Sequence, residues 1–349
     1  MDEKSVTVPD WVVYPEKEWM KITPAQAGFD VAKFKAIIAN STIKPGTFGG
    51  VVPHPEKWGV VLTRGGYLVQ TWGDTEYKYQ SASLGKSFTR ALVGLTIDSG
   101  LIQADDLIRE TWTGEGQLSH PHKYLDRGCH NTLTWRQLVN HQAGFILESG
   151  YHWRTKTVFH ANIPQWASWT GDPFYDNYAH TEPGDVTQYS SGGYCRLGQA
   201  LTALWNRDLK QVLDEKLLSH IGIPQDRWDW LPGGAVHFAK DFYPAIPHYG
   251  EYVDPPYYIN EHVVRGGPGW VVVSASDLAR FGLLVATGGI WKGERLISSE
   301  WIRGHPGVGI HLTDGDLDTI ISIGKVNTEG FPTLEMFKEL VIGPVVRTE

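Results

Sequence analysis

Residues 81–88 read Ser-Ala-Ser-Leu-Gly-Lys-Ser-Phe, and they open a predominantly apolar segment. After this stretch, apolar residues continue at helical spacing through Leu92 and Leu95, and Gly100 follows as a stop signal. Ser83 therefore lies at the predicted start of a helix. Lys86 follows three residues later, and residues three apart on a helix share a face.

The spacing of Ser83 and Lys86 suits nucleophilic catalysis. A serine hydroxyl is a weak nucleophile that needs a neighbouring base and a desolvated site. Burial favours the neutral form of an amine, which can then accept the hydroxyl proton. A helix N-terminus adds a positive dipole and unpaired N–H groups beside the nucleophile. The same spacing also fits an ordinary capped helix with an exposed lysine, because serine is a favoured N-cap.

Outward from this segment, the pattern predicts two β-hairpins. Strand-like runs at 58–63 and 67–72 flank a Gly-Gly turn, and runs at 305–312 and 317–326 flank Asp314-Gly315. Between and around the hairpins, the pattern predicts an extended segment at 270–274 and helices at 30–40, 84–99, 134–141, 193–205, 209–220, 277–285, 298–303 and 334–342.

This order of elements predicts an α+β fold, in which an antiparallel sheet is flanked by terminal helices and a mostly helical region is inserted. A chain of 349 residues suggests about two units. We expect residues 1–82 and 231–349 to form an α/β domain with both hairpins in one sheet. Residues 83–230 would form a mostly helical domain, with the active site in the cleft between the two.

Composition excludes several classes of partner. The net charge is −8 without a basic stripe, which argues against nucleic acid and anionic membranes. No apolar run has the length of a membrane-spanning helix. Residues 1–4 lack the features of a signal peptide, so the chain as given is expected to be cytoplasmic; a protein whose leader had been removed would begin in the same way. Two cysteines are too few for a disulfide framework.

No cofactor or metal site is predicted. His120, His122, His130 and His141 share one stretch, but the spacing of a metal motif is missing, and we interpret them as structural or solvent-facing. The Gly-x-Ser-x-Gly nucleophile elbow is also missing around Ser83. The fifteen tryptophans fit core anchors or an aromatic-lined cleft for an apolar ligand.

Three short segments, taken in order, carry a resemblance to a known family. They are Ser83-Leu-Gly-Lys86, Tyr189-Ser-Ser191 and His305-Pro-Gly307. Their order and spacing resemble the three motifs of the serine β-lactamase and penicillin-binding superfamily. The sequence is most similar to the class C-type branch, which includes family VIII carboxylesterases and related amide hydrolases. The likeness runs from about residue 20 to residue 345.

The resemblance implies an acyl-enzyme mechanism. Ser83 would be the nucleophile, Lys86 its partner, and Tyr189 a second acid–base that relays a proton to the leaving group. The backbone N–H groups of Ser83 and Val308 would form the oxyanion hole, and Gly307 would let the substrate approach the strand edge closely. A buried tyrosine with one hydrogen bond is the plainer interpretation of Tyr189.

Two departures from the family pattern bear on the substrate. Ser191 stands where the second motif usually has Asn, and His305-Pro306-Gly307 replaces Lys-Thr-Gly. His305 either begins this third motif or is an ordinary turn histidine. Both changes remove groups that recognise the amide and carboxylate of a β-lactam.

We therefore expect a carboxylesterase-like serine hydrolase whose partner is a small-molecule ester or amide, most simply a small to medium ester. The alternatives are a β-lactamase or D-amino-acid peptidase, which would cleave amides, and a non-catalytic penicillin-binding-like sensor.

Overall fold

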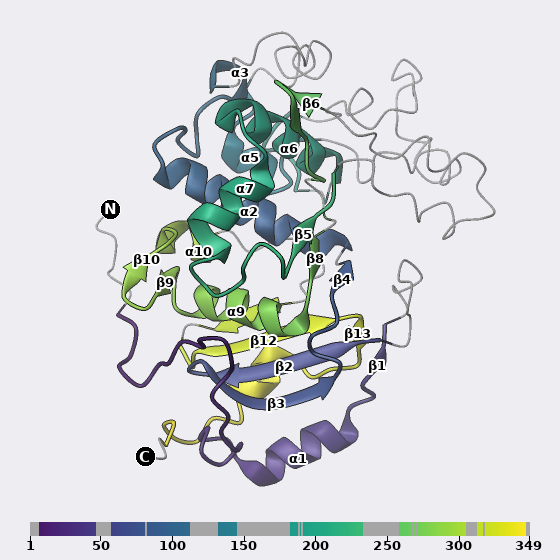
Figure 1. Cartoon of the computed structure of the whole chain (residues 1–349), viewed down its shortest axis with the longest axis vertical. Coiled ribbons are helices and arrows are strands. Elements are labelled where there is room, and N and C mark those ends of the chain that lie inside the picture. The colour runs from purple at the N-terminus through teal and green to yellow at the C-terminus, as the bar shows by residue number, and fades with distance from the viewer. Residues whose placement is uncertain are drawn as a thin grey trace, which may run out of the picture.

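Figure 1 shows a computed structural model of the chain, with a sheet and its covering helices in the lower part and most other helices above. The structure describes residues 7–46, 57–80, 82–111, 132–144, 182–187, 189, 191–232, 258–266, 269, 271–304, 313–316 and 318–346. The helices are α1 (Val31–Asn40), α2 (Gly85–Asp98), α3 (Ile108–Thr111), α5 (Trp135–Val139), α6 (Ser191–Trp205), α7 (Leu209–Leu213), α9 (Ala275–Ala286), α10 (Ser299–Gly304) and α11 (Leu334–Lys338).

The main sheet is antiparallel and has the order β11-β12-β2-β3. Its strands are β2 (Gly59–Arg64), β3 (Tyr67–Gly73), β11 (Thr313–Asp316) and β12 (Ile321–Val326). The first hairpin is confirmed, because β2 and β3 are joined through Gly65 and Gly66 at positive φ. Strand β12 pairs with β2 along its whole length, from Ile321 opposite Arg64 to Val326 opposite Gly59. Segments from the two ends of the chain thus share one sheet, as the α+β prediction requires.

The side chains of β2 alternate between two hydrophobic clusters. Val60 and Leu62 belong to the cluster that α1 and α11 form with the sheet, whereas Val61 belongs to the larger cluster on the other side of the sheet. Phe34 of α1 and Phe337 of α11 meet in the smaller cluster, with ring centroids 5.9 Å apart. Phe34 therefore faces the core between α1 and the sheet.

Helix α9 covers the opposite face of the sheet and lies between the sheet and the upper helices (Figure 1). Gly324 of β12 lies so close to Ala275 and Ala279 of α9 that a side chain there would collide with the helix backbone. The Ser322 hydroxyl donates to the Ala279 carbonyl at 3.0 Å. Ser274 caps α9 by accepting a hydrogen bond from the backbone N–H of Asp277.

Helix α2 is the central helix of the upper part. Phe88 stacks on Phe281 of α9 at 4.8 Å and lies parallel to Trp228 at 6.1 Å. Contacts of this kind contribute about 0.5–1.5 kcal/mol each beyond area burial. The Trp205 indole of α6 donates to Thr96 of α2 at 2.8 Å. Helix α2, which carries Lys86 in its first turn, is therefore held by α9 near its start and by α6 near its end.

The remaining strands form small sheets. One has the order β4-β8-β5, where β4 is Tyr79–Gln80, β5 is Asp229–Trp230 and β8 is Val271–Val273. The others pair β1 (Lys44–Pro45) with β13 (Thr328–Glu329), β6 (Tyr258–Ile259) with β7 (His262–Val263), and β9 (Ile290–Trp291) with β10 (Glu294–Arg295). Residues 230–265 include short strands at both ends, and residues 233–257 lie outside the described part of the chain.

The predicted turn at Asp314-Gly315 is wrong. Both residues lie within β11, where Asp314 is opposite Ile323 and Gly315 is opposite Ser322. The turn lies at residues 318–320, and Ile320 has a φ of 51°. Strand β12 is buried along nearly its whole length, and this tertiary constraint on its pairing overrides the local turn propensity. Residues 305–312, the other predicted strand, lie outside the described residues.

Two helices are shorter than predicted. The helix expected at 209–220 is α7 followed by a π-helical turn, η4 (Asp214–Leu218), and a backbone bond from Ile223 to the Leu218 carbonyl closes it. Helix α11 ends at Lys338 rather than 342, because Val341 pairs with Phe29 and Ile342 donates to the Gly28 carbonyl. In the part of the chain that the structure describes, no helix has the length and apolarity needed to cross a bilayer.

Candidate active site

Ser83 lies in η2 (Ala82–Leu84), a single 3-10 turn that leads directly into α2. The predicted position of Ser83 at a helix start is therefore confirmed. Gly85, the next residue but one, packs against the backbone of Gly269: a Cβ at residue 85 would lie 2.5 Å from Gly269 Cα. Glycine is therefore required at this position if the serine-bearing turn is to remain where it is.

Ser83, Lys86 and Tyr189 form a closed triangle of polar contacts. Lys86 Nζ lies 3.3 Å from Ser83 Oγ and 2.7 Å from the Tyr189 hydroxyl. The Tyr189 hydroxyl donates to Ser83 Oγ at 2.6 Å. Each of the three groups thus lies within hydrogen-bond reach of the other two, and a proton can pass between any pair.

The amine of Lys86 is enclosed by aromatic rings. Lys86 is only 5% exposed. Its Nζ lies 4.5 Å from the ring centroid of Tyr189 and 5.6 Å from that of Tyr194. Such burial excludes water from the amine and brings it into direct contact with its two polar partners. The isolated alternative, a helix cap followed by an exposed lysine, is therefore wrong.

Tyr189 precedes α6 by two residues and rests on His141. Their ring centroids are 4.9 Å apart at an interplanar angle of 29°, and His141 is also 4.9 Å from Tyr194. Tyr194 is fully buried and donates to the Val139 carbonyl at 2.8 Å. Burial raises the pKa of Tyr194, so this phenol remains neutral and acts as a fixed hydrogen-bond donor.

Two further buried groups flank the triangle in sequence. Burial raises the pKa of Tyr79 in β4 to about 12, so its phenol is neutral at physiological pH. Arg90 lies one helical turn after Lys86, and burial lowers the pKa of its guanidinium. Lys86 and Tyr194 are both buried beside Tyr189, so this part of the candidate site is shielded from water.

The sequence matches a known protein family. A model of the family described as Beta-lactamase matches residues 57–312, well over half of the chain. The chain belongs to the beta-lactamase family. The resemblance drawn from the three sequence segments is therefore confirmed, and with it the α+β fold. Members of this serine hydrolase superfamily, which includes esterases, β-lactamases and penicillin-binding homologues, act on small-molecule esters or amides.

Individual relatives of this beta-lactamase family chain are distant. Penicillin-binding protein 4 of Amycolatopsis lactamdurans is 27% identical over 248 residues, which cover 68% of this chain but only 58% of that protein. The chain thus spans less than two thirds of the length of this curated relative.

Solved structures share the beta-lactamase fold at low identity. A family VIII carboxylesterase superimposes with a TM-score of 0.53 at 16% identity, covering 93% of this chain and 98% of that one. An octameric penicillin-binding protein homologue from Pyrococcus abyssi gives 0.52 at 16% identity, covering 88% and 76%. At this identity the two superpositions establish a common fold.

The remaining predicted residues of the beta-lactamase pattern are not all placed. Ser191 is the first residue of α6, so its backbone is near Tyr189 in sequence, but its side chain lies outside the described residues. His305, Gly307 and Val308 also lie outside them. The third motif and the second oxyanion donor therefore remain predictions.

His141 is the residue that sequence reasoning underrated. It is 4% exposed and contacts Tyr189, so the solvent-facing interpretation is wrong for it, whereas His120, His122 and His130 lie outside the described residues. Its place at the end of the helix predicted at 134–141 gave no signal of this contact. Among the described residues, no group of three His, Cys, Asp or Glu could hold a metal ion.

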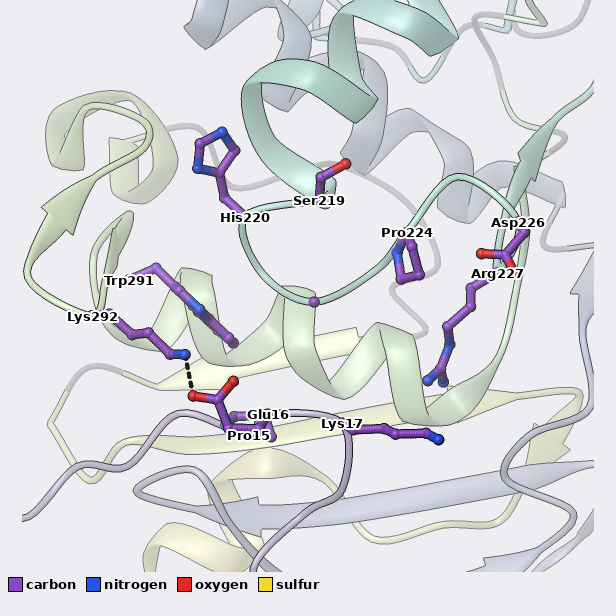
Figure 2. A pocket seen from close by; sticks show the side chains of 11 residues that line it. Pro15, Glu16, Lys17, Ser219, His220, Pro224, Asp226, Arg227, Trp291 and Lys292 are labelled. Atoms are coloured by element: carbon purple, nitrogen blue, oxygen red, sulfur yellow. Dashed lines mark hydrogen bonds and ion pairs between the residues drawn. The ribbon is translucent and has the colours of Figure 1, made fainter.

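A separate pocket of about 470 Å³ lies where the N-terminal segment meets the loop after η4 and the β9–β10 hairpin (Figure 2). Lys292 and Glu16 face each other across its floor as an ion pair. Arg227 is paired with Asp277 at 2.9 Å and with Glu76 at 2.9 Å. Because Ser83, Lys86 and Tyr189 do not line it and its principal charges are already paired, this pocket is not the candidate active site.

Proposed function

We propose that the protein is a serine hydrolase that forms an acyl-enzyme on Ser83, and that it is a carboxylesterase for small to medium esters. The triangle of Ser83, Lys86 and Tyr189 is the observation that carries this proposal. A nucleophile, a buried base and a second proton carrier within 3.3 Å of one another are what acyl transfer through serine needs.

In the proposed first step, Ser83 Oγ attacks the ester carbonyl carbon and forms a new C–O bond, while its proton passes to the amine of Lys86. The tetrahedral intermediate places negative charge on the former carbonyl oxygen. The backbone N–H of Ser83, at the start of α2, is the donor we assign to that oxygen, together with Val308 from the third motif. Each donor of this kind lowers the activation barrier by about 3 kcal/mol because it stabilises the oxyanion.

In the second step the ester C–O bond breaks, and the departing alkoxide takes the phenol proton of Tyr189. Lys86 then returns its proton to Tyr189 across the 2.7 Å contact. Water repeats the sequence: it attacks the acyl carbon, its proton enters the same relay, and Ser83 leaves with a proton as the acid is released. Atoms and charges balance without any cofactor.

The preference for esters rests on chemistry at the second motif. Ser191 offers no side-chain amide to the acyl group, where family members with Asn can bind the amide of a β-lactam or peptide. The penicillin-binding relative from Amycolatopsis lactamdurans supports amide cleavage or acyl-enzyme formation without turnover as the second candidate.

Hydrolysis of p-nitrophenyl acetate and butyrate, nitrocefin and a D-Ala-D-Ala peptide tests these functions side by side. The wild type should hydrolyse the esters, and Ser83→Ala should abolish turnover. Ser219→Ala is the matched control, because Ser219 is exposed at the pocket of Figure 2 and should leave turnover unchanged. Turnover retained by Ser83→Ala would reject the proposal, and preferential nitrocefin or peptide cleavage would reject the esterase assignment.

A further inference from the structure

We propose that His141 is a positioning residue that holds the ring of Tyr189 so that its hydroxyl stays between Ser83 and Lys86. The inference rests on the proposed function, because it assigns a role to His141 within the same proton relay. Its basis is the ring contact described above, at 4.9 Å between centroids and 29° between planes. A stacked neighbour at that distance restricts both the tilt and the rotation of a phenol ring.

Tyr189 needs such support because it lies outside regular structure. Helix α6 begins at Ser191, so helical geometry does not set the side-chain direction of Tyr189. Its hydroxyl must nevertheless remain 2.6 Å from Ser83 Oγ and 2.7 Å from Lys86 Nζ. Misplacement of a proton carrier by about 1 Å can cost on the order of a hundredfold in rate. A rigid surface behind the ring meets that requirement.

His141 is itself rigidly held. It lies just past α5, whose start is fixed by a reciprocal capping box between Thr134 and Gln137. Its backbone has a φ of 59°, a left-handed conformation that is uncommon outside glycine and that asparagine, aspartate and histidine adopt more readily than other residues. The backbone N–H of Gln142 donates to the Gln137 carbonyl at 2.8 Å and fixes the chain on the far side. A strained backbone of this kind persists where the surrounding structure demands it.

The second contact of His141 connects Tyr189 to the core. Tyr194 lies 4.9 Å from the His141 ring, is fully buried, and is tied to the end of α5 through the Val139 carbonyl. Lys86 Nζ lies near both tyrosine rings. His141 therefore connects the Tyr189 ring to the packed ends of α5 and α6.

The kinetic consequence depends on the leaving group. A p-nitrophenolate leaves without a proton, whereas an alkoxide must be protonated as it departs. If His141 acts by aligning Tyr189, its loss should lower kcat for an alkyl ester about tenfold to a hundredfold, with little change in KM. The burst rate of acylation by the p-nitrophenyl ester of the same acid should fall by less than about threefold, because that step needs no proton for the leaving group.

The test compares His141→Asn, His141→Gly and His141→Phe with the control His220→Asn. Asn and Gly tolerate a positive φ but remove the ring, and the two variants together cover the case in which one fails to fold. Phe keeps a flat ring without the imidazole nitrogens and should restore alkyl-ester turnover to within about threefold of wild type. His220 is an exposed histidine at the pocket of Figure 2, and its replacement should change nothing.

Equal losses on both esters would indicate a merely structural role and overturn the proposal, as would failure to restore activity in a Phe variant whose melting temperature matches that of the wild type. Labelling with 3-fluorotyrosine gives a readout that needs no turnover: the 19F resonance of Tyr189, assigned with Tyr189→Phe, should shift or broaden in His141→Asn but not in His220→Asn. An unchanged resonance contradicts the inference about His141. A wild type that fails to acylate at Ser83 contradicts the proposed function, whatever the resonance does.

Discussion

The hydroxyl of Tyr189 lies 2.6 Å from Oγ of Ser83, although 106 positions separate the two residues in the sequence. Ser83 belongs to the turn before α2, and Tyr189 to the segment before α6. The N-terminal ends of two buried helices therefore meet at one polar point. A change that shifts one helix relative to the other should break the hydrogen bond between Tyr189 and Ser83 before other contacts are lost.

Tyr189→Phe should lower kcat for alkyl esters by about 10²–10⁴-fold, the usual contribution of a general acid–base group. The ring remains in place against His141, so the melting temperature should stay within about 2 °C of wild type. Steady-state kinetics with ethyl butyrate, together with a thermal melt, check both parts. Retention of full alkyl-ester activity would remove Tyr189 from the mechanism.

Lys86→Met should abolish detectable ester turnover while leaving the protein at least as stable as wild type. Methionine matches the length of the lysine stem, and it removes a polar head that is almost entirely buried. Urea unfolding at pH 7 measures stability, and p-nitrophenyl butyrate measures turnover. A variant that loses stability in proportion to activity would indicate that Lys86 is mainly structural.

Gly85→Ala should disable the site by displacing the backbone. The added methyl group would meet the backbone of Gly269 at 2.5 Å, and backbone atoms cannot move aside as a flexible side chain can. We expect a stability loss of about 1–3 kcal/mol and a large fall in kcat. Gly343→Ala is the matched control, because the space around Gly343 is open to 4 Å, and it should change neither quantity. Normal activity in Gly85→Ala would show that the close approach is not required.

Asp208 should make the stability of the helical region depend on acid pH. Burial raises the pKa of its carboxyl, but the hydrogen bonds and charge of Arg265 outweigh this and hold the pKa below its usual value. The stabilisation is fully present above the unfolded pKa of about 4, and it is lost as the pH falls through the lower folded value.

Asp208→Asn keeps the N-cap of α7 but cannot titrate. At pH 7 it should be less stable than wild type by about 2 kcal/mol, and this difference should shrink below about pH 4. Urea unfolding at pH 7, 5, 4 and 3 measures it, and Arg265→Met should reduce the same pH dependence. A difference that is constant down to pH 3 would contradict this assignment.

The local sequence is sufficient to predict those helices and strands in which apolar residues recur at a regular spacing. The helix that carries Lys86 and the hairpin through Gly65 and Gly66 were predicted because apolar spacing and turn residues agree there. The pattern misplaced the turn at Asp314-Gly315 because the register of β12 against β2 is set by contacts across the sheet, which the local sequence does not contain.

Only part of the candidate site is predictable from the sequence. Ser83 and Lys86 are close in sequence, so their pairing follows from helix geometry, whereas Tyr189 was reached only through the order of three motifs. His141 could not be placed from spacing, because its role depends on how the end of α5 packs against the start of α6. Long-range packing of this kind leaves no local signature in the chain.

Formation of an acyl-enzyme on Ser83 is the central claim, and rapid-quench mass spectrometry of the intact protein tests it most directly. Mixing the wild type with p-nitrophenyl butyrate should give a single added butyryl group, and peptide mapping should place it on Ser83. The Ser83→Ala variant should acquire none. A hydrolysing enzyme without an adduct, or with the adduct on another residue, would contradict the account.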